Sequence, residues 1–482
     1  MRKILAFCIT AILFAGCNFK PETPQISANF KADFNSSNIN DFWWKNFNDE
    51  NLNMLIDSAL KNNSDLALAL NNIEYARVSL GLSKLEFLPN FTLSGSAVRQ
   101  NNFPQAPDAN HANIYQIGAG LNYELDLWGK VRNSVDAADS NFKATVYDYD
   151  NARLSIASSV ANLYFKFLSL KEQEKILTQT LAAYEQMANF RANQLKAGAI
   201  NNIVYYQSKA QVQSATASLI ATKTQINATN TALSIMTGKN YDEILHNNIK
   251  ASQTFPTLPE IPAGIPSDLL LHRADVASAL ERLKATNFLV GAQKANYFPS
   301  FSLTGAFGFA STEFDRLFVN NASSWNIGGS LIGPLLDFGR TKKRIDLANL
   351  DQNASFINYD KTLKTAFGDV RDALVSVKNS DLRTKTLKDL LATQQQVYNA
   401  AKLRYDSGYS DHIELLDSER NLLSAKLNLS MANYERYASE VALYKALGGG
   451  FSLKDSKTVN LINTNKTVMP NDSAFPVDKR IF

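Results

Sequence analysis

The sequence has 482 residues, of which 45% are hydrophobic and 20% charged, so it predicts about three domains or one large repeated architecture and excludes a wholly disordered chain. The net charge of +4 comes from dispersed basic residues, so we expect no nucleic-acid partner. Four histidines and two cysteines are too few and too scattered for a zinc, haem or iron–sulfur site, so we expect no metal and no cofactor.

The first seventeen residues have the pattern of a lipoprotein signal peptide. Two basic residues are followed by an apolar run over 4–15 and then by Gly16-Cys17. This run is too short for a stable transmembrane helix and is typical of a secretory signal. The cysteine resembles that of a bacterial lipobox, with Phe14 where a leucine is usual. We predict removal of 1–16 and acylation, including palmitate, of Cys17. An ordinary signal peptide with a chance cysteine is the alternative.

The mature chain is predicted to contain two copies of one structural unit. Several motifs recur at an offset of 210 residues: 88–95 at 298–305, Trp128-Gly129-Lys130 as Phe338-Gly339-Arg340, Gly198 as Gly408, and Gly238 as Gly448. Four motifs that recur at the same offset indicate an internal duplication.

Each copy is predicted to contain a helix, two strands and a long helical hairpin. Residues 131–197 lack glycine and proline, and their apolar residues recur at steps of three and four, which is a helical period. Residues 341–407 form the counterpart. Gly198 and Gly408 are expected to end these helices in left-handed caps, and a second helix follows each glycine.

Four segments alternate apolar or aromatic residues with small or polar ones: 91–103, 115–125, 301–310 and 325–331. This alternation is typical of a transmembrane β-barrel, and a soluble sheet with one buried face is the alternative. Four strands cannot close a membrane barrel, so the barrel must be shared among chains. Two chains would supply eight strands and three would supply twelve around a wet lumen.

Several motifs carry a resemblance to a known family. They are Phe42-Trp43-Trp44, 60–66, Asp126-Leu127-Trp128-Gly129-Lys130 and Phe298-Pro299-Ser300-Phe301. With them the chain resembles the TolC-like outer-membrane efflux channels, in the lipoprotein branch that serves resistance–nodulation–division pumps. Arg273-Ala274-Asp275 stands where relatives usually carry Arg-Pro-Asp.

The resemblance implies an α+β membrane protein in the outer membrane, lipid-anchored and with a large periplasmic part. It implies a homotrimer with a 12-stranded transmembrane β-barrel, four strands per chain, continued by a long α-helical periplasmic barrel. The implied partners are outer-membrane lipids, a periplasmic adaptor protein and an inner-membrane resistance–nodulation–division transporter.

The expected division of the chain follows from the signal, the duplication and the resemblance. The parts are a signal peptide (1–16), a tether and equatorial segment (17–47), the first repeat (48–238), a linker (239–266), the second repeat (267–448) and a tail (449–482).

The best candidate site follows Gly408. With Ser410 as helix cap, Glu414 and Asp417 share a face, with Arg420 one turn beyond and Ile413 beside them. The pattern alone fits a solvated helical face with an ordinary Asp417–Arg420 pair. The resemblance implies instead that these four residues form a periplasmic gate.

Three further expectations concern the tips of the two hairpins. The resemblance implies that the tips at Gly198 and Gly408 face the adaptor. The first copy carries Ile203 and Gln207 at the places corresponding to Ile413 and Asp417, so the gate charge comes from the second copy. His412 is predicted to be an exposed tip residue and not a ligand.

No catalytic motif is visible, so the protein is predicted not to be an enzyme. The predicted function is the exit duct of a tripartite efflux pump, which passively conducts small molecules such as drugs. A type I protein-secretion channel and a periplasmic coiled-coil scaffold without a pore are the alternatives. Metals, bile salts and antibiotics all remain open as exported compounds.

Overall fold

The computed structural model describes residues 42–100, 112–238, 255–256, 258 and 273–449. The predicted signal peptide, Cys17, most of the predicted linker and all but the first residue of the predicted tail lie outside this part of the chain. The described residues divide into two units. The first contains 72–146 and 278–361, and the second contains the rest.

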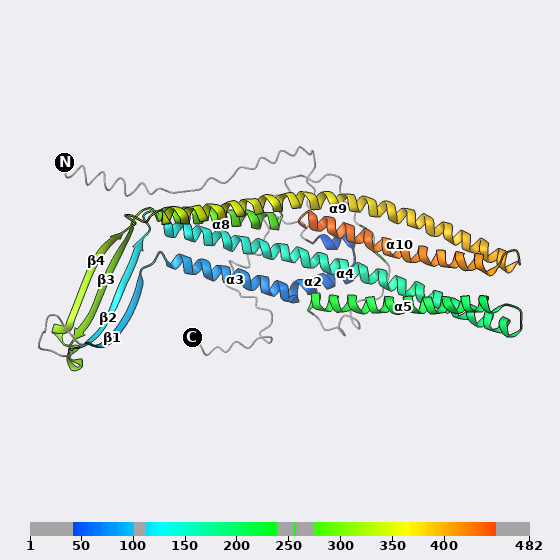
Figure 1. Cartoon of the computed structure of the whole chain (residues 1–482), viewed down its shortest axis with the longest axis horizontal. Coiled ribbons are helices and arrows are strands. Elements are labelled where there is room, and N and C mark those ends of the chain that lie inside the picture. The colour runs from blue at the N-terminus through cyan, green and yellow to red at the C-terminus, as the bar shows by residue number, and fades with distance from the viewer. Residues whose placement is uncertain (1–41, 101–111, 239–254, 257, 259–272, 450–482) are drawn as a thin grey trace. The chain divides into compact units, whose positions relative to one another are not determined.

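The elements repeat at the predicted spacing (Figure 1). The first copy has α3 (Ser64–Leu85), β1 (Asn90–Gln100), β2 (Ala112–Leu125), α4 (Lys130–Lys196) and α5 (Asn202–Thr237), and the second has α8 (Ala274–Ala295), β3 (Ser300–Ser311), β4 (Ser323–Ile332), α9 (Arg340–Asp406) and α10 (His412–Ala446). Helices α4 and α9 have 67 residues each. The short helices are η1 (Trp43–Phe47) and α2 (Glu50–Asn62) before α3, and η2 (Phe314–Arg316) and η3 (Asn320–Ala322) between β3 and β4. The internal duplication is confirmed.

The first unit contains an antiparallel sheet in the order β1-β2-β3-β4, drawn as four neighbouring arrows in Figure 1. Asn90 lies opposite Asn122 in the first strand pair, and 210 residues on Ser300 lies opposite Ile332 in the second. The two copies therefore share one register. All four predicted strands are present, and the described part of β1 ends at Gln100, before the predicted end at 103.

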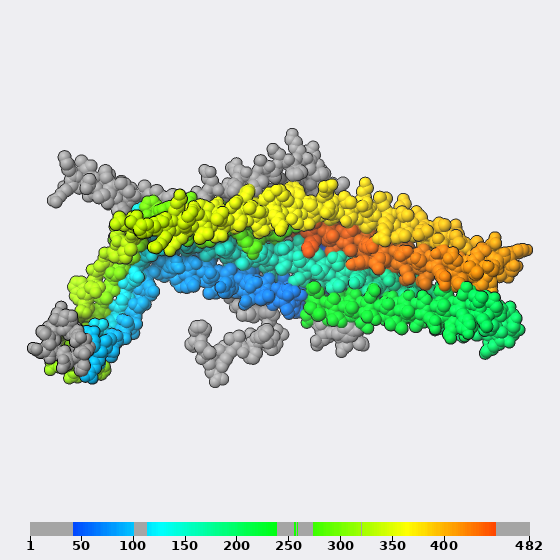
Figure 2. Space-filling model, viewed as in Figure 1, coloured from blue at the N-terminus to red at the C-terminus, as the bar shows by residue number. Residues whose placement is uncertain are grey.

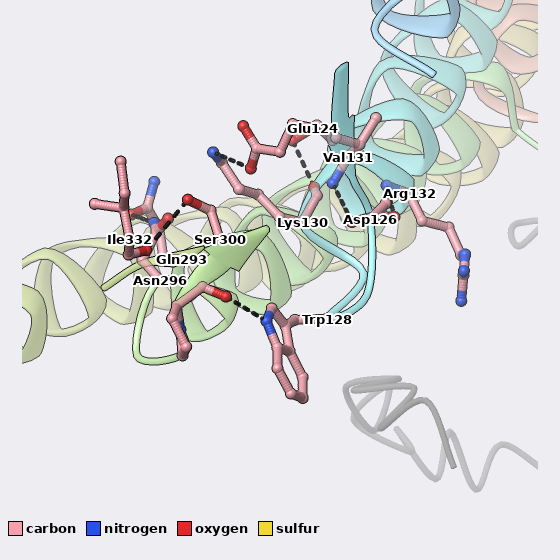
Figure 3. Close-up of polar contacts among 12 residues, drawn as sticks. Glu124, Asp126, Trp128, Lys130, Val131, Arg132, Gln293, Asn296, Ser300 and Ile332 are labelled. Atoms are coloured by element: carbon pink, nitrogen blue, oxygen red, sulfur yellow. Dashed lines mark hydrogen bonds and ion pairs between the residues drawn. The ribbon is translucent and has the colours of Figure 1, made fainter. Parts of the chain in front are cut away.

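The corner from β2 to α4 is held by side chains of both copies (Figure 3). The Trp128 ring stacks on Phe298 with centroids 4.7 Å apart, and its Nε1 donates to the Pro299 carbonyl at 2.7 Å. Asp126 accepts from the N–H groups of Val131 and Arg132 at 2.9 Å each, which satisfies free donors at the helix start. One ring stack and three hydrogen bonds thus hold the passage from strand to helix.

The core of the second unit is an aromatic cluster beside η1. Trp43 stacks on Tyr444 at 5.2 Å, and Phe47 lies 5.2 Å from Phe165, centroid to centroid. Full burial of such a side chain contributes about 1.5–3 kcal/mol. This cluster brings the segment before α2 together with α4 and α10. No described helix is long and apolar enough to span a membrane.

The two helical hairpins also meet in the second unit. Ser169 of α4 donates to the Ser430 carbonyl of α10 at 2.9 Å, and both side chains are buried. Figure 2 shows the ends of the hairpins, green for the first and orange for the second, side by side. Small buried residues at this contact let the long helices approach closely.

Candidate functional site

The two hairpins end in turns of the same construction. Gly198 and Gly408 have φ of +72° and +78°, in the left-handed region. At the first turn, the N–H groups of the glycine and of the next residue bond back to the helix at 2.9 Å each, and at the second they do so at 3.0 and 2.8 Å. This is the Schellman arrangement. Both glycines end their helices as predicted.

The cap of α10 is Asp411, so the predicted cap at Ser410 is wrong. Asp411 Oδ1 accepts from the N–H groups of Ile413 at 3.0 Å and Glu414 at 3.2 Å. A carboxylate and a hydroxyl at a helix start can both accept hydrogen bonds from the free N–H donors. The carboxylate also carries a negative charge, which interacts favourably with the helix dipole. In the first copy the equivalent Asn201 caps α5 and accepts one N–H at 3.1 Å.

The four predicted gate residues lie on one exposed face of α10: Ile413, Glu414, Asp417 and Arg420. Ile413 is 60% exposed although it is aliphatic. The opposite face is buried and carries Leu415, Leu416 and Ser418. The shared face of Glu414 and Asp417 is confirmed, while the gate role of this face stays a prediction.

Arg420 contacts the first hairpin instead of its own helix. With the Gln211 amide oxygen turned toward the guanidinium, Gln211 of α5 accepts from Arg420 Nη2 at 2.7 Å and also from Nε. Asp417 Oδ2 accepts from Asn421 Nδ2 at 3.2 Å. Within the described part of α10, Asp417 and Arg420 form no ion pair, so the ordinary pair of the alternative, a solvated helical face, is absent. The buried Gln211 offers Arg420 a partner on α5.

Glu414 is tied to the other helix of its own hairpin. Its Oε1 lies 3.2 Å from Arg404 Nε of α9, and both side chains are about half exposed. An exposed pair of this kind contributes about 0.2–1 kcal/mol, so it biases the position of Glu414 without locking it.

His412 is buried, so the prediction of an exposed tip residue is wrong. Its side chain is 8% exposed because Arg191 of α4 covers it, with Arg191 Nη2 3.4 Å from His412 Nδ1. The Tyr405 ring of α9 packs against both groups, with its centroid 5.0 Å from Arg191 Cζ and 6.1 Å from the centroid of the His412 ring. Burial, and then the Arg191 charge, lower the pKa of His412 from its ordinary value of 6.5.

Arg191 is the residue that the sequence analysis missed. It is 2% exposed, and its side chain bonds to Gln194 at 2.7 Å and contacts His412, with no ion pair to a carboxylate among the described residues. Arg191 Nε and His412 Nε2 both lack a hydrogen-bond partner in the described chain. Burial raises the pKa of the nearby Glu419, which the charges of Lys402 and Arg191 partly offset.

A second charged region lies at the corners of the first unit. A recess of about 330 Å³ is lined by charged residues of both copies, among them Glu124, Lys130, Asp337, Arg340 and Arg344. Lys130 Nζ bonds to Glu124 Oε1 at 3.1 Å (Figure 3), so part of this charge is already paired. No group of three or more His, Cys, Asp or Glu in the described residues has the arrangement of a metal site.

Two stretches of the chain, 55–239 and 265–449, match the family model described as outer membrane efflux protein. The chain belongs to the outer membrane efflux protein family. The matched stretches begin 210 residues apart, as do the two copies of the fold. The family model therefore matches each copy of the internal duplication that the sequence predicted.

Similar proteins include a cation efflux system protein, a probable outer-membrane lipoprotein and an outer-membrane channel. The chain is 29% identical to the cation efflux system protein CusC of Escherichia coli O6:H1, over 93% of this chain and 99% of CusC. It is 30% identical to the probable outer membrane lipoprotein SilC of Salmonella typhimurium, over 92% of this chain and 97% of SilC. The crystal structure of the CmeC outer membrane channel of Campylobacter jejuni matches with a TM-score of 0.86 and 33% identity, covering 93% of this chain and 98% of CmeC.

These findings confirm the resemblance and the predicted role of an outer-membrane efflux channel. The chain is an outer-membrane efflux protein, and its relatives include channels and a lipoprotein.

Proposed function

We propose that three copies of this chain form the exit duct of a tripartite efflux pump. The duct passively conducts small molecules from a periplasmic adaptor and an inner-membrane resistance–nodulation–division transporter to the exterior. Family membership supports this function. One feature of the structure supports the proposed assembly: a four-stranded sheet with two edge strands and a register that repeats between the copies.

Among the described strands, each outer strand of the sheet has a neighbour on one side only. Strands β1 and β4 lie at opposite edges, every residue of β1 is exposed, and nearly all of β4 is exposed as well. Unpaired N–H and C=O groups are costly in hydrocarbon, so a spanning sheet must close. A second copy offers the matching edge, because β4 of one chain can pair with β1 of the next.

The duplication predicts the register of that pairing. Where the copies meet inside the chain, Ile117 of β2 lies opposite Phe309 of β3. A shift of 210 residues maps Ile117 onto Ile327 of β4 and Phe309 onto Arg99 of β1. Ile327 of one chain should therefore lie opposite Arg99 of the next chain.

The corner contact predicts the same junction independently. Inside the chain, Trp128 stacks on Phe298. The equivalent residues are Phe338, which is 83% exposed, and Leu88, which is also exposed. Contact of Phe338 with Leu88 of the next chain would remove two large apolar side chains from water.

Three chains would supply twelve strands, enough for a water-filled lumen, whereas two would give a lumen filled by side chains. The remaining parts of the proposal are the division of the chain into a signal, two repeats, a linker and a tail, and acylation of Cys17. The tips at Gly198 and Gly408 would meet the adaptor, and the exposed α10 face from Ile413 to Arg420 would line the gate.

The test is cysteine cross-linking of the assembled protein. In antiparallel strands, directly opposite residues have Cα atoms about 4.5–5.5 Å apart, within reach of a disulfide. Ile327→Cys with Arg99→Cys should give covalent products that stop at three chains. The matched control, Ile327→Cys with Ala97→Cys, is two residues out of register and should cross-link poorly.

Products that stop at two chains, or equal yields from both pairs, would contradict the trimer or its register. Conductance of the purified protein in a planar bilayer then tests the duct itself. A trimer without conductance would favour the scaffold.

A further inference from the structure

The contact between Arg191 and His412 joins the two hairpins at the start of the proposed gate helix. Arg191 comes from α4 of the first hairpin, and His412 is the first residue of α10. His412 directly precedes Ile413 and Glu414, so any shift of its side chain acts on the first turn of α10. Figure 2 shows the two hairpin ends that this contact connects.

The partner of Arg191 is unusual for so buried an arginine. Buried charges are normally paired with an opposite charge, because desolvation is costly. Here the partner is an imidazole, which can accept a hydrogen bond only while the facing nitrogen is unprotonated. The contact therefore depends on the charge of His412.

Of the other charged groups around this contact, Asp411 favours a protonated His412, but its effect is smaller than those of burial and of the Arg191 charge. From α9, the Tyr405 ring lies 6.1 Å from the His412 ring, centroid to centroid, and Lys402, which is positive, acts on the nearby Glu419. From its own segment, His412 faces Asp411, whose Oδ1 already bonds the α10 backbone. Glu419 lies farther along α10, near Lys402 and Arg191, and it has a raised pKa.

We propose that Arg191 and His412 form a proton-sensitive latch that positions the first turn of α10 and releases it when His412 gains a proton. Arg191 is a positioning residue, because it acts on the gate through His412. Protonation places two cations at the 3.4 Å contact and removes the acceptor, so the start of α10 separates from α4. The latch rests on the proposed function, since the gate on α10 is part of it.

The direction of the pH dependence follows from the lowered pKa of His412. The folded state binds the proton less readily than the unfolded chain does, so the contribution of the latch to stability is fully present above the ordinary pKa of 6.5. It is lost as the pH falls below that value and through the pKa of the folded state. The channel should therefore open more readily in acid.

The experiment records single-channel conductance of purified trimers from about pH 8 to about pH 5, the range in which histidine titrates. The wild-type conductance should rise severalfold in acid. His412→Asn installs the residue that the first copy carries at position 202, and it should keep the conductance low across the range. Because Glu419 is intact in this variant, any remaining acid response measures Glu419 and not the latch.

Two arginine variants test the partner. Arg191→Lys keeps the charge and should retain the acid response, whereas Arg191→Gln removes the repulsion and should lose it. Arg404→Gln is the matched control, because it breaks the exposed pair with Glu414 on the same tip. It should leave the acid response in place.

The latch is overturned if the wild type shows no acid response, or if His412→Asn responds as fully as the wild type. Size-exclusion chromatography of each variant shows that the trimer is intact. A trimer that conducts at no pH would instead overturn the proposed duct, and the latch with it.

Discussion

The two hairpin tips have one backbone and two different surfaces. Both end in a Schellman turn on a glycine with positive φ, and both continue in a helix capped by a side chain. The second tip presents Glu414, Asp417 and Arg420 on its exposed face, whereas the first tip carries the uncharged Val204, Gln207 and Ala210 at the matching positions.

The difference shows what duplication preserves and what it leaves free. Backbone geometry is preserved because glycine positions and helix lengths determine it. Side chains can diverge because the tips do not share one environment: the first hairpin contributes Arg191 and Gln211, and the second receives them at His412 and Arg420. Residues of the first hairpin thus contact the second tip, and the second tip is the one that carries Glu414, Asp417 and Arg420.

The largest expected effect tests the two faces of α10. Leu415 is 3% exposed, so Leu415→Ala should lower the free energy of unfolding by about 2–4 kcal/mol through lost burial and a cavity. Ile413→Ala, on the exposed face, should cost less than about 1 kcal/mol. Denaturant unfolding of the detergent-solubilised trimer measures both. Equal costs would mean that Ile413 is buried in the assembly.

The next effect tests whether the two turns are equivalent. Gly198→Ala and Gly408→Ala should each lower the free energy of unfolding by about 1–2 kcal/mol, because an L side chain is strained at positive φ. An added Cβ meets no atom within 4 Å at either position, so crowding adds nothing. Thermal unfolding of the two variants should give similar shifts. A clear difference would show that one turn changes conformation in the assembly.

The smallest effect tests the two caps. Asn201→Ala and Asp411→Ala should each cost about 1 kcal/mol. At low salt, Asp411→Ala should lower the free energy of unfolding by about 0.3–1 kcal/mol more than Asn201→Ala does, because the Asp411 charge also interacts with the helix dipole. Unfolding measured at low and high salt should show this excess shrinking. An excess that persists in high salt would contradict its electrostatic origin.

Much of the fold could be predicted because its signals are local. The ends of α4 and α9 follow from Gly198 and Gly408, and the strands follow from alternation within ten or so residues. The repeat spacing then linked the copies without any knowledge of contacts. The proposal that several chains close the sheet into one barrel rests on counting strands.

The candidate site was predictable only in part, because burial depends on which helix covers a face. Helical period correctly placed Glu414 and Asp417 together. It could not show that Arg191, 221 residues before His412, covers that histidine. For the same reason it could not show that Arg420 contacts Gln211 on α5. The cap was misplaced by one residue because Ser410 and Asp411 are both good caps.

The most direct test of the account measures ion selectivity in planar bilayers at low salt, where screening is weakest. Carboxylates that converge from three chains attract cations, so the wild-type trimer should prefer cations. Replacing Glu414 and Asp417 together with alanine should shift the reversal potential toward zero. The matched change in the first tip, Val204 and Gln207 to alanine, should leave it unchanged. Unaltered selectivity in the first variant would show that the exposed face of α10 does not line the pore.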